Sequence, residues 1–258
     1  MSYQLENLRT SLKKVGIKKG DIIYLSGNLF LLGSFFPKKK ILKSFYEVLI
    51  SILGKKGTIC FPTHSFNIIS KKKLFNLNST PSETGVVTEY LRKKKGSVRQ
   101  DHPYASITSI GRYAKFICKK NTNNVYGPNS PFSRMIRLNS KVLNFGLEPR
   151  FCCTSVHHSE FMSKVPYRYN KKFRQKVKIN KRIKIKNYYM FVIKDNLINI
   201  KRDKNKKIFK HFQKKNKILK TKLGKSFIYC YSLKKFYNDN MILFKKDRYA
   251  WLKEKPKL

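Results

Sequence analysis

The densest group of reactive side chains in this sequence is the stretch 152–160, which reads CCTSVHHSE. It follows a β-like run at 141–147, and a threonine or serine at 154–155 would cap a helix that begins there. His157 and Glu160 would then stand three residues apart on one face of that helix, within reach of each other. A carboxylate beside an imidazole fixes the ring tautomer and raises its basicity, which is how a general base is built.

The same stretch allows other interpretations. Spacing alone agrees equally well with an ordinary core or surface histidine at position 157 and a solvated glutamate at position 160. A thiol of Cys152 or Cys153 near His157 would form an acyl-enzyme, because an imidazole lowers the pKa of a neighbouring thiol. Two cysteines with His157 and His158 would also suit zinc, but adjacent cysteines rarely reach one metal and no CxxC pair accompanies them. We therefore expect no metal site.

The segments that must position this stretch alternate between two patterns. Apolar residues recur at helical spacing, and short apolar runs bounded by glycine or proline predict strands. We expect helices at 5–15, 45–53, 85–95 (behind a capped beginning at 78–82) and 132–138, and strands at 22–25, 57–61, 106–110 and 141–147. Polar residues follow the first two strands, where an open sheet places its ligands. The pattern predicts an α/β fold, a central mixed sheet flanked by helices.

The pattern of apolar and polar residues changes after residue 163. The segment 177–185 alternates valine or isoleucine with lysine or asparagine, and 188–193 is apolar, which indicates antiparallel strands. We expect one or two solvated helices at 203–225, a strand at 227–233 and a mobile lysine-rich tail, so the C-terminal part is antiparallel and β-rich. The chain then divides into a core at 1–163 and a lysine-rich part at 164–258 packed on it.

The composition is globular and strongly basic. Hydrophobic residues make up 41% of the 258 residues, and 59 lysines and arginines against 13 acidic residues give a net charge of +46. Such a charge suggests a nucleic acid or an anionic surface as partner. However, the lysines are spread through every segment together with Ile, Asn, Phe and Tyr, all encoded by A/T-rich codons, and no nucleic-acid-binding motif appears. We expect no nucleic-acid partner, and keep a nucleic-acid-binding role of 164–258 as the alternative function.

Five cysteines, an odd number without a paired framework, indicate reduced thiols and a cytoplasmic protein. The first twelve residues are amphipathic and include Glu6, so they predict a helix and not a signal peptide. The most apolar stretch, 45–53, is too short to span a bilayer. We therefore expect no membrane partner, and the sequence predicts no oligomeric state.

Four blocks of the sequence carry a family resemblance through their order and spacing. They are Gly20-Asp21 with Leu29 and Leu32-Gly33; Gly57-Thr58 with Phe61-Pro62-Thr63; Ser79-Thr80-Pro81-Ser82 with Gly85, Glu89, Arg92, Gly96, Arg99, His102-Pro103, Ser106 and Gly111; and Gly127, Ser130-Pro131, Arg134, Leu138, Lys141-Val142-Leu143 and Gly146 before Thr154-Ser155-x-His157-x-x-Glu160. Together they resemble the aminoglycoside 3-N-acetyltransferase family, coenzyme-A enzymes with an α/β fold of their own that differs from the GNAT fold.

The resemblance covers 20–160, and in the C-terminal part it appears only at Tyr167-Arg168-Tyr169. The chain departs from the family pattern at 26–28, where Ser-Gly-Asn replaces His-Ser-Ser. It also departs at Cys153, where asparagine is frequent, and at His158, where an apolar residue is usual. The first departure changes a side-chain donor in a turn that approaches the cofactor.

The resemblance implies an acyltransferase that uses acetyl-CoA as co-substrate, without a metal, and transfers the acetyl group directly to the amine of a small-molecule amino sugar. It implies that His157 is the general base and that Glu160 orients it. It further implies that the 164–258 part contributes to the acceptor side, and that Arg99 serves the phosphates. The family positions on the cofactor side correspond here to Asn28, Leu29, Thr80, Ser82, Arg99, His102 and Ser106.

The charge of the chain bears on the acceptor. The family is associated with antibiotic resistance, but aminoglycosides are polycations that need acidic pockets, and this chain has only 13 acidic residues. An amino sugar linked to a nucleotide or a glycan is easier to bind, and its phosphates would use the lysine excess. Asp101, Glu148 and Glu160 lie in the matching region and would still allow an acidic pocket.

Overall fold

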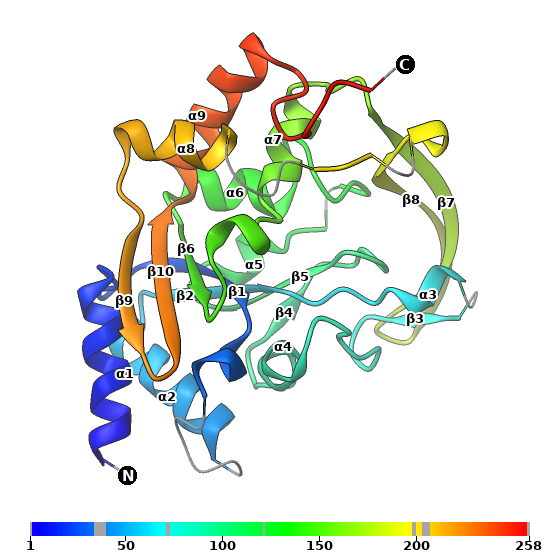
Figure 1. Cartoon of the computed structure of the whole chain (residues 1–258). Helices are drawn as coiled ribbons and strands as arrows, with labels where there is room; N and C mark the ends of the chain where they lie inside the picture. The colour runs from blue at the N-terminus through cyan, green and yellow to red at the C-terminus, as the bar shows by residue number, and fades with distance from the viewer. Residues whose placement is uncertain are drawn as a thin grey trace.

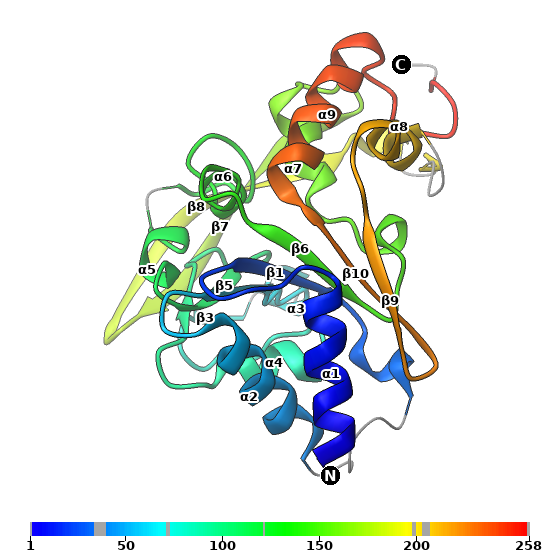
Figure 2. The same cartoon turned by 90° about the vertical axis from the view of Figure 1, so that its left-hand side faces the viewer.

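A computed structural model of the chain describes residues 2–33, 40–70, 73–120, 122–197, 200–202 and 207–256. Its centre is a seven-stranded mixed sheet with helices on both faces (Figure 1 and Figure 2). In spatial order the strands are β4 (Val98–Arg99), β5 (Ile107–Gly111), β2 (Thr58–Pro62), β1 (Ile22–Gly27), β6 (Lys141–Phe145), β10 (Ser226–Ser232) and β9 (Leu219–Leu223). The predicted α/β class with a central mixed sheet is confirmed.

The middle of the sheet is parallel. Strand β1 pairs in parallel with β2 on one side and with β6 on the other, so the carboxyl ends of the three strands meet at one edge. Ser26 lies opposite Asn144 in this register. The backbone N–H of Asn28 then donates to the carbonyl of Phe145 at 2.8 Å, which keeps the end of β1 against β6.

Alternation along β1 divides the interior into two cores, because successive side chains of a strand point to opposite faces. Ile23 and Leu25 pack in the core that is covered by α1 (Ser2–Lys14) and α2 (Ile41–Leu53). Ile22 and Tyr24 pack in the other core. In Figure 2 the first two helices lie below the sheet and most of the others above it. The second core is built with α5 (Ala114–Ile117), α6 (Pro131–Arg137), α7 (Val156–Met162), α8 (Lys207–Lys215) and α9 (Leu233–Lys246).

Helix α9 packs against α7 and is hydrogen-bonded to it. The side-chain amide of Asn240 on α9 donates to the hydroxyl of Ser159 on α7 at 3.4 Å, and both residues are fully buried. Phe236 and Phe244 of α9 are buried in the same core as Val156 of α7. The position of α7 therefore depends on a helix that is more than seventy residues further along the chain.

The C-terminal third contributes to both sheets. Strand β10 pairs antiparallel with β6 and β9 with β10, so residues on both sides of position 163 share the main sheet. A second, three-stranded sheet consists of β3 (Phe75–Asn76), β7 (Arg168–Ile179) and β8 (Arg182–Ile193). The antiparallel strands that we predicted are present, but their pair begins at Arg168 and turns at Asn180, which has a positive φ of 57°.

Two predictions for this third differ from the structure. The segment 203–225 contains a helix as predicted, α8, but it continues into the strand β9, and Phe209 and Phe212 of α8 are buried and not solvated; residues 203–206 lie outside the described ones. The predicted mobile tail begins with α9 and continues to Trp251 and Leu252, which are 6% and 1% exposed. Long-range packing of large apolar side chains decides both cases.

The helix predicted at 85–95 is shorter in the structure. Helix α4 spans Val86–Arg92 with Gly85 at its N-cap, so the stretch 78–82 is a turn before the helix and not its cap. The remaining short elements are α3 (Asn67–Ser70) and the 3₁₀ turns η1 (Leu29–Leu32), η2 (Pro149–Phe151) and η3 (Asp195–Leu197). Within the described ranges, each helix is too short or too polar to cross a membrane.

Candidate active site

His157 and Glu160 stand on the inner face of α7 and contact each other. Nδ1 of His157 lies 2.5 Å from Oε2 of Glu160, so the ring donates its Nδ1 proton to the carboxylate. Glu160 is fully buried, whereas the side chain of His157 is 19% exposed. Nε2 of the ring has no hydrogen-bond partner among the described residues. Ser155 holds the N-cap position of α7 without a side-chain capping bond, so the predicted cap is not what places the pair.

Glu160 is held by two further residues that follow α7. The hydroxyl of Tyr167 donates to Oε1 at 2.6 Å, and Nε of Arg168 lies 3.1 Å from Oε2. Burial alone would raise the pKa of Glu160, but attraction to His157 and Arg168 and the hydrogen bonds outweigh it and lower that pKa. The carboxylate therefore stays charged, and both of its oxygens are occupied. It can therefore orient His157 through Oε2.

The pKa of His157 is lowered from its ordinary value. Burial is the main cause, and the attraction of Glu160 opposes it. Arg168 and Arg202 lower this pKa further, because they repel a positive charge on the ring. The imidazole is therefore neutral at neutral pH, with the lone pair on Nε2, which is the form that a general base requires.

Tyr167 and Arg168 were not among the predicted site residues. They follow Glu160 by seven and eight positions, beyond the end of α7, so no helical spacing connects them with it. The available signal was the motif Tyr167-Arg168-Tyr169, the one place where the C-terminal part resembles the acetyltransferase pattern. In the structure, Tyr167 and Arg168 both contact the carboxylate of Glu160.

The neighbouring cysteines have no part in the pair. Burial raises the pKa of the Cys152 thiol to about 11 and that of the Cys153 thiol to about 12, so both are protonated near neutral pH. The side-chain amide of Asn144 donates to Sγ of Cys152 at 2.7 Å, and the hydroxyl of Ser26 donates to its carbonyl at 2.9 Å. These bonds tie the segment before α7 to the ends of β6 and β1. The geometry does not support an acyl-enzyme.

A zinc site would need His158 beside the cysteines, and the structure places it elsewhere. Its Nδ1 accepts a hydrogen bond from the backbone N–H of Gly127 at 3.4 Å, and its ring stacks on Phe132. Burial lowers the pKa of His158 to about 4. In the part of the chain that the structure describes, no group of three or more histidine, cysteine, aspartate or glutamate side chains is arranged to hold a metal ion.

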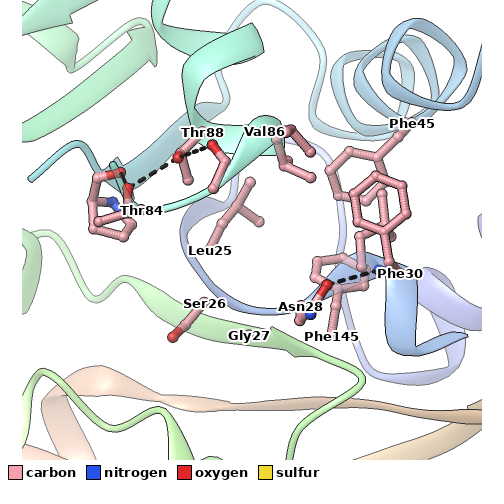
Figure 3. Close-up of a pocket in the computed structure, with 14 residues that line it drawn as sticks. Leu25, Ser26, Gly27, Asn28, Phe30, Phe45, Thr84, Val86, Thr88 and Phe145 are labelled. Atoms are coloured by element: carbon pink, nitrogen blue, oxygen red, sulfur yellow. Dashed lines mark hydrogen bonds between the residues drawn. The ribbon is translucent and has the colours of Figure 1, made fainter. Parts of the chain in front are cut away.

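A cavity of about 410 Å³ opens at the carboxyl end of β1 (Figure 3). The predicted cofactor residues Asn28 and Leu29 line it, together with the beginning of α4, which sequence reasoning did not assign to the site. Its walls are Leu25, Ser26, Gly27, Asn28, Leu29, Phe30, Phe45, Pro62, Thr84, Gly85, Val86, Val87, Thr88 and Phe145. The cavity adjoins the segment before α7, because Ser26 lines the cavity and also binds the carbonyl of Cys152.

Polar groups line the cavity at two places. Oδ1 of Asn28 accepts a hydrogen bond from the backbone N–H of Phe30 at 3.0 Å, which leaves its amide group for other partners (Figure 3). The hydroxyls of Thr84 and Thr88 lie 3.0 Å apart across the first turn of α4. Ser82, a predicted cofactor residue, stands behind them with its hydroxyl 2.7 Å from that of Thr84. It positions the lining threonines and does not itself line the cavity.

Gly27 lines the cavity, and its backbone lies very close to the backbone of Phe145 on β6. Its φ is +95°, and a Cβ at this position would lie 2.3 Å from the carbonyl oxygen of Phe145. A side chain at position 27 would push β1 away from β6.

Arg99, Ser106 and Thr80 form an internal network and do not line this cavity. The guanidinium of Arg99 is buried and donates to the hydroxyl of Ser106 at 2.9 Å and to the carbonyl of Thr80 at 2.5 Å. It also donates to the carbonyl of Thr63 at 2.6 Å and to the hydroxyl of Ser65 at 2.9 Å. All of its nitrogens are used, so the prediction that Arg99 serves the phosphates is not supported by its surroundings.

The same holds for His102, which is fully buried. Its Nδ1 accepts a hydrogen bond from the backbone N–H of Ala105 at 3.1 Å, which makes Nε2 the donor to the carbonyl of Tyr189 at 3.2 Å. Burial lowers the pKa of His102 to about 4. Both ring nitrogens are occupied, and the histidine connects the core to β8 of the second sheet.

Comparison with known proteins identifies the family. The sequence model described as aminoglycoside 3-N-acetyltransferase matches residues 35–244, most of the chain. The chain belongs to this family. The aminoglycoside N(3)-acetyltransferase VII of Streptomyces paromomycinus is 31% identical over 91 residues, which cover 35% of this chain and 31% of that protein. The aminoglycoside N(3)-acetyltransferase III of Salmonella sp is 23% identical over 175 residues, 60% of this chain and 59% of that protein.

The aligned parts thus span less than two thirds of these aminoglycoside 3-N-acetyltransferases. Solved structures extend the likeness of the fold over nearly the whole chain. The YokD protein from Bacillus subtilis has a TM-score of 0.76 at 19% identity and covers 94% of this chain and 99% of its own. The structure of AAC-IIIb in a binary complex with CoASH has a TM-score of 0.77 at 16% identity and covers 98% of both chains. At these identities the likeness shows a shared fold.

Proposed function

We propose that this member of the aminoglycoside 3-N-acetyltransferase family is an acetyl-CoA-dependent N-acetyltransferase that acts on the amine of an amino sugar. The observation that carries the proposal is the His157–Glu160 pair, in which Nδ1 is bound to a buried carboxylate and Nε2 has no partner among the described residues. The family supports the proposal, as does the shared fold of a neighbour whose structure contains CoASH.

The cavity at the end of β1 fits the pantetheine arm of coenzyme A. That arm consists of methylene groups and two amides, and the cavity offers apolar walls with amide and hydroxyl groups between them. Asn28, Thr84 and Thr88 would hold the amides, and Phe45 and Val86 would pack against the methylenes. When bound, the co-substrate supplies a thioester whose carbonyl carbon the amine attacks. None of the residues that line this cavity is a lysine or an arginine, so the phosphates would bind beyond it.

His157 would take the proton from the amine of the acceptor as the new C–N bond forms. The proton passes to Nε2, while the Nδ1 proton remains in its bond to Glu160. The ring then carries a positive charge, which the buried carboxylate stabilises. When the C–S bond of the thioester breaks, the leaving thiolate of coenzyme A would take this proton from Nε2. A base of this kind contributes roughly a hundredfold to ten-thousandfold in rate.

The charges around the site favour an acceptor that is neutral or anionic. The three carboxylates that would have made an acidic pocket all have partners within the protein: Asp101 pairs with Lys186 at 3.0 Å, Glu148 with Arg150 at 2.6 Å, and Glu160 with Arg168 at 3.1 Å and with the neutral ring of His157. A polycationic antibiotic would find no free carboxylate among them. The acceptor that fits is an amino sugar linked to a nucleotide or to a glycan.

A panel of acceptors tests the proposal. Purified protein is supplied with acetyl-CoA and with uridine-diphosphate-linked amino sugars, free amino sugars or kanamycin, and the product is identified by mass spectrometry. We expect acetylated nucleotide sugar, with a kcat/KM at least about tenfold above that for kanamycin. We expect His157→Ala to lose most of the turnover while keeping the wild-type circular dichroism spectrum. Comparable rates on kanamycin would refute the acceptor class, and full activity of His157→Ala would refute the mechanism.

A further inference from the structure

A second cavity, of about 450 Å³, lies where η2, α8 and the β9–β10 hairpin meet; we call it the α8 cavity. In Figure 1, α8 lies above this hairpin. Its apolar walls include Phe209 and Ile218. Its polar lining is Glu148, Arg150, Lys210, Gln213, Lys220 and Tyr229. A wall that combines aromatic surface with several cations suits a ligand that has both a flat ring and a phosphate.

The α8 cavity has an excess of positive charge. Glu148 is the one carboxylate that lines it, and Nε of Arg150 lies 2.6 Å from that carboxylate, so these two charges offset each other. Lys210 and Lys220 are exposed, and neither has a carboxylate within ion-pair distance in the described part of the chain. Two ammonium groups that face one cavity without counter-charge repel each other, and an anion between them removes this cost.

The segment 148–152 lies between the α8 cavity and the cavity at the carboxyl end of β1, which we call the cofactor cavity because we propose that coenzyme A binds there. On one side, Glu148 lines the α8 cavity, and its carbonyl accepts from Sγ of Cys152 at 3.5 Å. On the other side, the carbonyl of Cys152 accepts from Ser26, which lines the cofactor cavity. Tyr229 stands opposite Asn144 in the sheet, and Asn144 also binds Cys152. The same segment continues into α7, so it connects the α8 cavity to the helix that carries His157 and Glu160.

We infer that the α8 cavity binds the phosphate groups of the acceptor, and that the acceptor is an amino sugar linked to a nucleoside diphosphate. The inference rests on the proposed function and adds to it the chemical class of the substrate and its binding residues. Lys210 and Lys220 bind the phosphates, and Tyr229 and Phe209 pack beside the nucleoside. The amine then lies at the far end of the ligand, toward His157.

Binding of uridine diphosphate, measured by calorimetry, tests the cavity without any need for catalysis. We expect the double variant Lys210→Glu/Lys220→Glu to weaken binding at least about tenfold, since a charge-assisted hydrogen bond to phosphate is lost at each position. The matched control Lys214→Glu/Lys222→Glu makes the same change of charge at exposed positions on the same two elements outside the cavity. We expect it to bind uridine diphosphate within about threefold of wild type. Equal losses in both variants, or none, would overturn the inference.

Three further measurements separate the possible failures. If Lys210→Glu/Lys220→Glu weakens coenzyme A as strongly as uridine diphosphate, the phosphates belong to the cofactor and the inference is wrong. If His157-dependent acetylation of the nucleotide sugar occurs with an unchanged KM in that variant, the proposed function holds and the cavity does not. If uridine diphosphate binds as expected but no amine is acetylated, the cavity holds and the proposed function falls.

Discussion

The hydroxyl of Tyr167 donates to Oε1 of Glu160 at 2.6 Å, the carboxylate oxygen that His157 does not use. Removing this hydroxyl leaves a buried carboxylate oxygen without a donor. We expect Tyr167→Phe to lower the free energy of unfolding by about 1–3 kcal/mol, and to reduce acetyl transfer by less than His157→Ala does. Tyr169→Phe is the matched control, because that hydroxyl bonds to the exposed Asp195 at 3.4 Å. Equal stability of the two variants, measured by urea denaturation, would contradict the role of Tyr167.

The pH dependence of turnover follows from the pKa of His157. A general base must be neutral, and burial lowers the pKa of His157 from its ordinary value of about 6.5 despite the attraction of Glu160. The rate should therefore be level near neutral pH and should fall only as the pH drops below about 6.5. Glu160→Gln removes the charge that opposes burial, so we expect the fall to move to lower pH while the level rate decreases. A kcat/KM profile of both proteins measures this. A fall centred above pH 7 in the wild type would argue against His157 as the base.

The cysteines offer a test of direct transfer. Both thiols are protonated near neutral pH because burial raises their pKa, and neither is within hydrogen-bonding distance of His157 in the described structure. We expect Cys152→Ala and Cys153→Ala each to keep turnover within about threefold of wild type, less than 1 kcal/mol in activation free energy. Intact-protein mass spectrometry after mixing with acetyl-CoA should show no acetylated thiol. A trapped acetyl-cysteine that disappears on adding the acceptor would establish the acyl-enzyme route instead.

Gly27 provides a test of the cofactor cavity. An alanine there would have both a positive φ and a Cβ 2.3 Å from the Phe145 carbonyl oxygen, whereas an alanine at Gly96 would have a positive φ of 83° with open space around it. We expect Gly27→Ala to lower the free energy of unfolding by about 1–3 kcal/mol more than Gly96→Ala does. It should also weaken coenzyme A binding, which the control leaves unchanged. Thermal denaturation with and without coenzyme A measures both effects. Equal losses in the two variants would show that the contact with Phe145 is of no consequence.

Local periodicity was sufficient to predict the pair on α7. His157 and Glu160 are three residues apart in one helix, so their contact requires no knowledge of the rest of the fold. The family resemblance predicted Asn28 and Leu29 as cofactor residues, and their place after a strand that ends at the ligand edge of the sheet agrees with it. Each of these predictions depends on a single helix or strand and not on contacts between distant segments.

Contacts between distant segments were not predictable in this way. The family resemblance made Arg99 and Ser106 candidates, but the partners of Arg99 come from 63–65 and 80 as well as from Ser106, and both residues are buried. Thr84 and Thr88 had no sequence signal because they line the cavity only where the beginning of α4 meets the end of β1. The strand β9 reads Leu-Lys-Thr-Lys-Leu and is recognisable only once β10 is beside it. In each case the deciding partner is remote in the sequence.

The support of α7 by α9 sets an order of assembly. The ribosome completes the His157–Glu160 pair early, but Asn240, which bonds to the middle of α7, is synthesised about eighty residues later. Long-range contacts of this kind form slowly, since a large loop must close first. A nascent chain that carries every residue lining the cavity at the end of β1 therefore still lacks the helix that packs against α7. Under the proposed function, acetyl transfer begins only once α9 has left the ribosome and packed against α7.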